Sequence, residues 1–191
     1  MGKFRDSRTA RNLMLSFAGE SQARNRYTYF SRRALEEGYV QIADIFRETA
    51  DQECEHALRF FKFFNGGEME ITGSFPSGVI ADTYANLTAA ADGERFEHTR
   101  LYPDFAQTAR DEGFERAAET WEAIIVSERQ HEKRYRELAA NLLAGKTFAR
   151  ERETVWRCRN CGYLHTGTRP PDKCPACVMP RGYFELLAEN W

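Results

Sequence analysis

The sequence predicts a mainly α-helical protein in which a four-helix bundle is followed by a small metal-knuckle β domain. The first three quarters of the 191 residues divide at glycines into four helix-length segments, each with an apolar stripe at alternating spacings of three and four. The last quarter holds short strand-like runs, turn residues and four of the five cysteines. We therefore expect a bundle domain at residues 1–145, a linker at 146–153 and a cysteine-containing domain at 154–191.

The overall composition excludes several classes of protein. The chain is 42% hydrophobic and 29% charged, which is typical of a globular protein. Its formal net charge of −2 gives no reason to expect nucleic acid or a membrane surface as a partner. The N-terminus lacks the apolar stretch of a signal peptide, and no segment approaches the roughly 18 apolar residues that indicate a membrane span. We therefore expect a cytoplasmic protein.

The helix boundaries follow from the glycines. Gly38 separates a helix expected at about residues 6–36 from one expected at about 39–64. A long connection that contains glycine and proline leads to a third helix, which ends near Asp111, and a fourth helix continues to Ala144. Two short turns around a longer middle connection resemble the ferritin-like arrangement of four helices.

Carboxylates interrupt the apolar stripe of every helix. In the fourth helix, the stripe that includes Trp121 and Ile124 continues through Glu128 and His131. A carboxylate on a buried face is severely destabilising unless a positive group accompanies it. The residues in question, helix by helix, are Glu20; Glu53 and His56; Glu94 and Glu97; and Glu128 and His131.

These side chains are expected at one level of the bundle. Glu20 and Glu53 lie at similar sequence separations on either side of the turn at Gly38. Glu97 and Glu128 are likewise almost equally far from the turn at Gly113. In antiparallel helices, near-equal distances from a turn place residues side by side. Five glutamates and two histidines are therefore predicted to converge on one layer.

A two-metal site would balance the charge of this layer. Five carboxylates carry −5, which two ferrous ions reduce to −1 and two ferric ions convert to +1. Mixed oxygen and imidazole ligands suit iron or manganese, and zinc remains chemically possible. Buried salt bridges or helix-surface charges are the alternative, but two Glu-x-x-His motifs at matched depth favour the metal site.

Cysteine spacing predicts another metal site near the C-terminus. Cys158 and Cys161 form one Cys-x-x-Cys pair, Cys174 and Cys177 form a second, and twelve residues separate the pairs. Without an export signal, this pattern favours a tetrathiolate metal site over disulfides. Spacing alone does not distinguish iron from zinc, because tetrahedral sulfur sites accept both. We expect the small apolar core of this domain to contain Trp156, Tyr163, Phe184 and Trp191.

Several sequence motifs resemble the rubrerythrin family. They are Ala-Gly-Glu-Ser-Gln-Ala-Arg-Asn-Arg-Tyr at 18–27 and Tyr-Phe-Glu-Leu-Leu at 183–187, besides the ligand pattern itself. The motifs Cys-Arg-Asn-Cys-Gly-Tyr and Cys-Pro-Ala-Cys resemble rubredoxin. The resemblance covers essentially the whole chain. It implies a ferritin-like bundle with two non-haem irons, and a rubredoxin-like domain with one iron, or zinc in its place.

The resemblance also implies individual roles for the ligands. Ferritin-like sites generally use four glutamates and two histidines, and rubrerythrins add a carboxylate three residues after the third-helix ligand, which is Glu97 here. Glu97 and His56 would exchange at one iron as the oxidation state changes. The other expected roles are bridging ligands for Glu53 and Glu128, and terminal ligands for Glu20, Glu94 and His131.

Two tyrosines are candidates for catalytic residues. Tyr27 lies seven residues after Glu20 on the same helix face, and Tyr102 lies near Glu97. Either hydroxyl group could donate a hydrogen bond to a ligand carboxylate and supply a proton, as tyrosines do in rubrerythrins. Ordinary aromatic packing is the alternative.

The remaining cysteine and histidines are expected to have no role at these sites. Cys54 lies about 100° around its helix from Glu53, so we interpret it as a bystander thiol. His98 and His165 have no partner pattern and are expected to face solvent.

The leading hypothesis for function is a di-iron peroxidase that reduces hydrogen peroxide to water in oxidative-stress defence. Electrons would return singly through the tetrathiolate iron from rubredoxin or a flavoprotein reductase. The resemblance implies a head-to-tail homodimer, which brings the rubredoxin-like domain of one subunit to the di-iron site of the other. Two alternatives stay open: a ferroxidase or iron-handling protein with Fe(II) as substrate, and a metal-binding protein with zinc in its tail. Glu97 and the electron-transfer tail argue against the ferroxidase.

Overall fold

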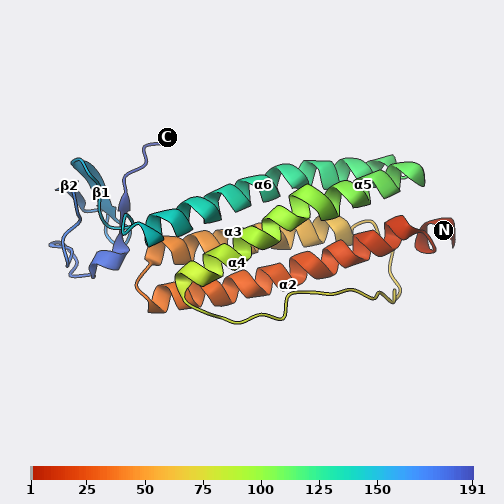
Figure 1. Cartoon of the computed structure of the whole chain (residues 1–191), viewed down its shortest axis with the longest axis horizontal. Helices are drawn as coiled ribbons and strands as arrows, with labels where there is room; N and C mark the ends of the chain where they lie inside the picture. The colour runs from red at the N-terminus through yellow and green to blue at the C-terminus, as the bar shows by residue number, and fades with distance from the viewer. Residues whose placement is uncertain (1) are drawn as a thin grey trace.

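The computed structural model describes residues 2–191 and confirms the predicted fold class. Four long helical segments lie side by side, and a small three-stranded domain sits at one end of them (Figure 1). The helices are α1 (Gly2–Arg5), α2 (Arg8–Glu36), α3 (Val40–Phe61), α4 (Thr83–Phe96), the π-helical turn η1 (Glu97–Leu101), α5 (Tyr102–Asp111) and α6 (Glu115–Leu143). Among the helices described, none combines the length and the apolar character needed to cross a membrane.

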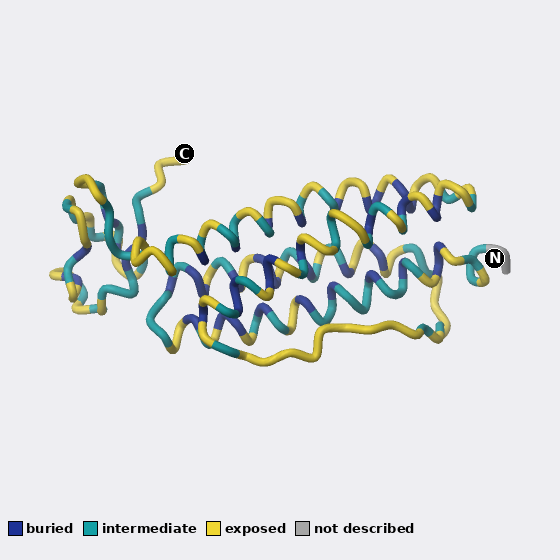
Figure 2. Tube along the Cα trace, viewed as in Figure 1, coloured by how far each residue is buried: buried dark blue, intermediate teal, exposed yellow. Residues whose placement is uncertain are grey.

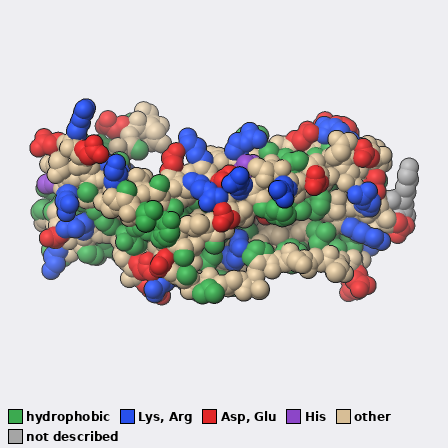
Figure 3. All heavy atoms as spheres, in the orientation of Figure 1, with side chains coloured by type: hydrophobic (Ala, Val, Ile, Leu, Met, Phe, Trp, Pro, Cys, Tyr) green, Lys and Arg blue, Asp and Glu red, His purple; other side chains and the backbone are tan. Residues whose placement is uncertain are grey.

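The connection between α3 and α4 determines how the helices are ordered. It runs along the outside of α2 for much of the length of the bundle, so that α4 begins at the end where α3 began (Figure 1). The tight turn between α2 and α3 has Gly38 in the left-handed region, with φ of +83°. Charged side chains of both signs are interspersed over the face drawn in Figure 3.

The third helical segment departs from the regular helix that the sequence predicts. Its α-helical bonding is interrupted at η1, where the N–H of Tyr102 donates to the carbonyl of Glu97, five residues earlier. Pro103 follows directly and has no N–H to donate to the preceding turn, so the α-helical pattern cannot continue unbroken through it. Hydrophobic spacing does not detect such an expansion by one residue, which explains why an uninterrupted helix was expected.

Apolar residues fill the bundle in two clusters on either side of the carboxylate layer. Towards the Gly38 turn, the cluster includes Phe30 and Phe46; towards the other end, it includes Phe60 and Trp121. Buried positions recur along α2, α3, α4, α5 and α6, as the tube in Figure 2 shows. Apolar packing therefore flanks the level at which the ionisable residues lie on both sides.

The C-terminal domain is an antiparallel sheet with strand order β2-β1-β3. Its elements are β1 (Thr154–Cys158), β2 (Leu164–Gly167), the 3₁₀ turn η2 (Arg181–Tyr183) and β3 (Phe184–Leu186). Trp156 and Phe184 are buried, with Tyr163 packed against them, as predicted. The prediction for Trp191 is wrong: this residue lies beyond β3 and is 86% exposed.

The small domain packs closely on the turn between α2 and α3. A Cβ atom added to Gly182 would lie 2.0 Å from the carbonyl oxygen of Gly38, so two backbones meet there without a side chain between them. Arg159, which lies between the first two cysteines, forms an ion pair of 2.8 Å with Asp44 of α3. These contacts hold the cysteine domain at the end of the bundle.

The substitution Gly182→Ala tests this packing. The added methyl group collides with backbone, which cannot move aside as a side chain can, so we expect domain packing to be weakened by about 1–3 kcal/mol. Hydrogen–deuterium exchange should become faster in residues 146–153 and in β3. Gly78→Ala is the matched control, because nothing lies within 4 Å of a Cβ at that position. Equal exchange in the two variants would contradict the described packing.

Candidate metal centres

The four helices bring six of the predicted residues together as two overlapping groups. In each group, one ligand atom from every residue lies within 4.8 Å of those from the others. The first group is Glu20, Glu53, His56 and Glu128; the second is Glu53, Glu94, Glu128 and His131. Because Glu53 and Glu128 belong to both groups, they lie between two adjacent positions that could each hold a metal ion, and their role as bridging ligands stays a prediction.

Both histidines direct Nδ1 towards the carboxylates. Nδ1 of His56 lies 2.9 Å from Glu53 Oε2 and 3.0 Å from Glu128 Oε1. Nδ1 of His131 lies 2.9 Å from Glu128 Oε2 and 3.2 Å from Glu53 Oε1. Each Glu-x-x-His motif therefore contributes its two ligands to the same layer, as the helical spacing of three residues requires.

Unpaired oxygen atoms show that this layer fits metal ions. Buried carboxylate oxygens with no hydrogen-bond donor in the described structure other than the layer's own histidines occur on four of its glutamates: Glu20, Glu53, Glu94 and Glu128. Buried acceptors of this kind are destabilising unless a cation satisfies them. Their oxygen and imidazole atoms are the ligand set that iron accepts. The cluster is thus a di-iron site in its chemistry as well as in its geometry.

Without a metal ion, protons take the place of the missing charge. Burial raises the pKa of Glu20, and the charges of Glu53 and Glu128 raise it further. Burial alone would lower the pKa of each histidine, but hydrogen bonds to Glu128 and Glu53 outweigh it. They raise the pKa of His56 to about 10 and that of His131 to about 12. The metal-free layer therefore holds protons that metal ions must displace.

Glu97 lies at the edge of the layer. It is half-buried at the start of η1, and within the described chain it belongs to neither group of four. Burial raises its pKa, and the charges of Glu94 and Glu128 raise it further, whereas the charge of Arg26 lowers it. Glu97 is thus within electrostatic reach of the layer, and its role as a ligand stays a prediction.

Both candidate tyrosines contact the layer through their hydroxyl groups. The hydroxyl of Tyr27 donates to Glu94 Oε1 at 2.5 Å, and that of Tyr102 donates to Glu20 Oε1 at 2.5 Å. Burial raises the pKa of both phenols, and the neighbouring carboxylate of each raises it further. Each phenol therefore remains protonated beside a carboxylate. Their catalytic role stays a prediction.

Sequence reasoning missed the partner of His131. Nε2 of this histidine lies 3.0 Å from Oε1 of Gln52, which fixes the ring with Nδ1 towards the carboxylates. Gln52 immediately precedes Glu53 but lies outside the apolar stripe, so periodicity gave no signal for it. A buried histidine does require a partner for its second nitrogen, but only the packing of α3 on α6 identifies which residue supplies it.

The other histidines and Cys54 are placed as follows. The prediction that His98 faces solvent is wrong: its Nε2 lies 2.7 Å from Glu132 Oε2, and its side chain is only 9% exposed. His165 is half-buried on β2. Cys54 is a half-buried free thiol and, within the described chain, belongs to no cluster of metal-ligand atoms.

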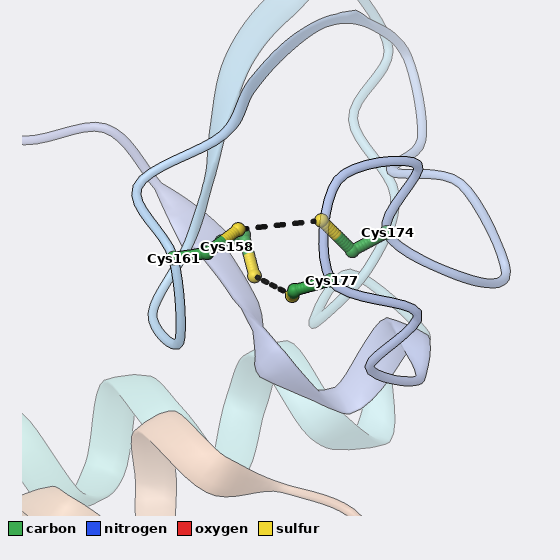
Figure 4. A group of neighbouring side chains, drawn as sticks. All are labelled: Cys158, Cys161, Cys174 and Cys177. Carbon is green, nitrogen blue, oxygen red and sulfur yellow. Dashed lines mark hydrogen bonds between the residues drawn. The ribbon is translucent and has the colours of Figure 1, made fainter.

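The other four cysteines form one compact site between two loops (Figure 4). Sγ of Cys158 lies 3.7 Å from Sγ of Cys177, and Sγ of Cys161 lies 3.6 Å from Sγ of Cys174. A disulfide would require about 2.0 Å. Four thiolates at about 2.3 Å from one tetrahedral ion lie roughly 3.8 Å apart, which agrees with the observed separations.

Backbone N–H groups stabilise negative charge at this site. A hydrogen bond from the N–H of Met179, together with one from the Asn160 side chain, lowers the pKa of Cys177 to about 6. The N–H of Tyr163 also lowers the pKa of Cys161, but proximity to the Cys177 sulfur outweighs it and raises that pKa to about 12. Burial raises the pKa of Cys158 as well, so of these three thiols only Cys177 favours the thiolate, and a metal ion would have to displace protons from Cys158 and Cys161.

The bundle and its two sites define a class: a ferritin-like di-iron protein with a rubredoxin-like tail. Comparison with protein families gives the same result. The family model described as rubrerythrin matches residues 11–139, and that of the rubredoxin-like domain of rubrerythrin matches residues 156–185. This chain belongs to the rubrerythrin family.

Individual relatives are similar to this chain along nearly its whole length. The rubrerythrin of Nitratidesulfovibrio vulgaris is 56% identical over 191 residues, which are 100% of both chains. That of Porphyromonas gingivalis is 52% identical and covers 97% of this chain and 92% of its own. The structure of nigerythrin in its fully reduced, all-ferrous state is 31% identical, with a TM-score of 0.63 over 95% of this chain and 90% of that one.

The substitution Gln52→Leu tests the orientation of His131. Without its partner, the ring loses the hydrogen bond that orients Nδ1, so we expect the bundle to bind Fe(II) about 10- to 100-fold more weakly. Anaerobic competition with a chelator measures this affinity. Gln107→Leu is the control, because that exposed amide bonds only Asp111 on its own helix. Equal affinities in the two variants would rule out the orienting role.

Metal loading should also release protons. Because His56 and His131 hold protons at pH 7 in the metal-free protein, Fe(II) must displace them, and the affinity for metal must rise with pH. We expect at least about two protons per chain, one from each histidine, with any protons held by the carboxylates in addition. An anaerobic titration with Fe(II) in weakly buffered indicator solution measures them. Loading without proton release would contradict the assigned charge states.

Proposed function

We propose that this chain is a non-haem di-iron peroxidase that reduces hydrogen peroxide to water in defence against oxidative stress. The observation that carries the proposal is the pair of tyrosine hydroxyls, which each donate to a carboxylate of the layer at 2.5 Å. Conversion of one peroxide molecule into two waters consumes two electrons and two protons. Storage of iron requires no buried proton donors.

The two phenols are suited to deliver these protons. Burial and the adjacent carboxylates raise the pKa of Tyr27 and Tyr102, so both carry a proton at neutral pH. Each is hydrogen-bonded to a different glutamate, Glu94 or Glu20, so that both metal positions have a donor nearby. A phenol in this position can donate as the oxygen atoms become more basic during reduction.

The contacts of the two histidines support the proposed exchange between Glu97 and His56. His131 is held at both ring nitrogens, because Nε2 contacts Gln52 while Nδ1 faces the carboxylates. In the described part of the chain, the polar contacts of His56 are all made by Nδ1, and its side chain is 14% exposed against 3% for His131. His56 is thus the ring with fewer restraints on movement.

The tetrathiolate site has a role in this proposal because the reaction needs a supply of electrons. When bound, the two bundle irons would supply the two electrons that break the O–O bond, and the tetrathiolate iron would return single electrons from an external donor. From the family resemblance, we infer that the donor is rubredoxin or a flavoprotein reductase.

We propose a head-to-tail homodimer because electrons must pass from the cysteine site to the carboxylate layer. Within one chain, the cysteine domain lies beyond the Gly38 turn (Figure 1), and the stretch of α2 from Glu20 to that turn is roughly 27 Å long. The cysteine domain of a partner subunit, packed along the bundle, would lie much closer to the layer.

Rapid mixing of the diferrous protein with hydrogen peroxide tests the proposed reaction. We expect fast oxidation of the bundle irons, followed in stopped-flow spectra. Tyr102→Phe should slow this oxidation by at least about tenfold, because one proton donor is lost while Tyr27 remains. Tyr135→Phe is the control: it removes a buried hydroxyl from the same bundle that makes no hydrogen bond to a carboxylate in the described structure.

Two results would contradict the proposal. Slow oxidation of the unmodified diferrous protein by peroxide would exclude a peroxidase. Equal rates for Tyr102→Phe and Tyr135→Phe would remove the phenol as a proton donor and would leave its hydrogen bond to Glu20 as a structural contact only.

A further inference from the structure

The motif Tyr-Phe-Glu-Leu-Leu contains a buried carboxylate that the proposed reaction does not use. This residue, Glu185, lies on β3 and is only 7% exposed. In the antiparallel register it stands directly opposite Arg157 of β1, so the two side chains share one face of the sheet. An ion pair of 2.5 Å joins Arg157 Nη2 to Glu185 Oε1. The carboxylate is therefore paired within its own sheet.

A second arginine connects this pair to the bundle. Arg159, which follows β1 directly, forms an ion pair through Nη1 with the other oxygen of Glu185. Nη2 of the same guanidinium lies 2.8 Å from Oδ2 of Asp44 on α3. Two arginines and two carboxylates thus form one connected group with a formal charge of zero. Glu185 is the carboxylate that contacts both arginines.

This group of charges lies next to a ligand of the cysteine site. Cys158 stands between Arg157 and Arg159 in the chain, so each guanidinium lies no more than about 13 Å from its sulfur, whatever the rotamer. The side chain of Asp44 is 53% exposed, whereas that of Glu185 is only 8% exposed. Because solvent and salt screen exposed charges more strongly, Glu185 is the main counter-charge for the two arginines.

The sign of the electrostatic effect follows from the charge of the site. Reduction of a tetrathiolate iron adds one negative charge, so nearby positive charge stabilises the reduced form and raises the reduction potential. Without Glu185, only the half-exposed Asp44 would oppose the two guanidinium groups. The reduced iron would then hold its electron more tightly and would be a poorer donor to the bundle.

We propose that Glu185 sets the reduction potential of the tetrathiolate iron by balancing the charge of the two arginines beside Cys158. It is a positioning residue, because it acts through Arg157 and Arg159. Asp44 contributes to the same balance from the bundle, so the potential also depends on the packing of the two domains. The inference rests on the electron supply proposed for this iron, but its test requires no peroxide.

Redox titration of the iron-loaded holoprotein, followed by the visible absorption of the tetrathiolate iron, tests this role. Glu185→Gln should raise the reduction potential and shift the equilibrium with a reference electron carrier about three- to tenfold towards reduced iron; tenfold is about 59 mV for one electron. Glu189→Gln is the matched control, because that carboxylate belongs to the same domain and is exposed. Equal potentials for the two variants would overturn the proposal.

Opposite changes of charge separate electrostatics from loosening of the fold. Arg159→Gln removes one positive charge and should lower the potential, and the double variant with Glu185→Gln should return towards the wild-type value. Loosened packing would admit water to the cysteine site in either single variant and would therefore move both potentials in the same direction. Shifts of equal sign in the two single variants would leave Glu185 as a structural contact only.

Asp44→Asn provides a variant that lies outside the cysteine domain. It should raise the potential as Glu185→Gln does, but by a smaller factor, because the carboxylate of Asp44 is half-exposed and therefore screened. A potential that is unchanged or lowered would refute the contribution of the bundle. Asp44→Asn and Arg159→Gln also decide the proposal if Glu185→Gln fails to retain iron.

The outcome is separable from that of the proposed function. If the diferrous protein reacts rapidly with peroxide but Glu185→Gln has the potential of Glu189→Gln, the role of Glu185 fails while the peroxidase stands. If the diferrous protein does not react with peroxide, the peroxidase fails, and the measured potentials still decide the role of Glu185.

Discussion

The structure depends on the compensation of negative charge in one buried layer. Four buried glutamates meet two histidine nitrogens between two clusters of aromatic and aliphatic residues. Neither cluster can supply positive charge. The helices can therefore pack at full density only if cations, or protons in their absence, occupy the layer. The equal depth of the ligands on four helices follows from this requirement.

The two sides of the layer differ, and the difference suggests how the site works. On one side, Gln52 fixes His131, and Arg134 contacts Thr49, so the ligands are rigidly supported. On the other side, the third helical segment expands into a π turn at Glu97, next to a cavity of about 250 Å³. We take this asymmetry, with a fixed histidine ring on one side and open space on the other, to favour turnover over storage.

Sequence reasoning captured the features that depend on spacing. The three-residue interval of Glu-x-x-His, the matched depths and the two Cys-x-x-Cys pairs predicted which ligand atoms would meet, because helix and knuckle geometry determine them. It could not find features that depend on how helices pack. The hydrogen bond between His131 and Gln52 and the contact of His98 with Glu132 depend on side chains that face a neighbouring helix, and the π turn is a one-residue expansion of the backbone that hydrophobic spacing does not detect. The prediction that Trp191 belongs to the small core was wrong because an aromatic residue that is close to this core in sequence need not pack into it.

Mössbauer spectroscopy of the purified protein enriched in ⁵⁷Fe, combined with metal analysis, tests the central claim most directly. The account predicts three irons per chain: two in oxygen and nitrogen environments in the bundle, and one in a tetrathiolate environment. A folded bundle that still takes up fewer than two metal ions from an excess of Fe(II) would contradict it, because the ligand atoms of the layer would then not form the two metal positions on which the account depends.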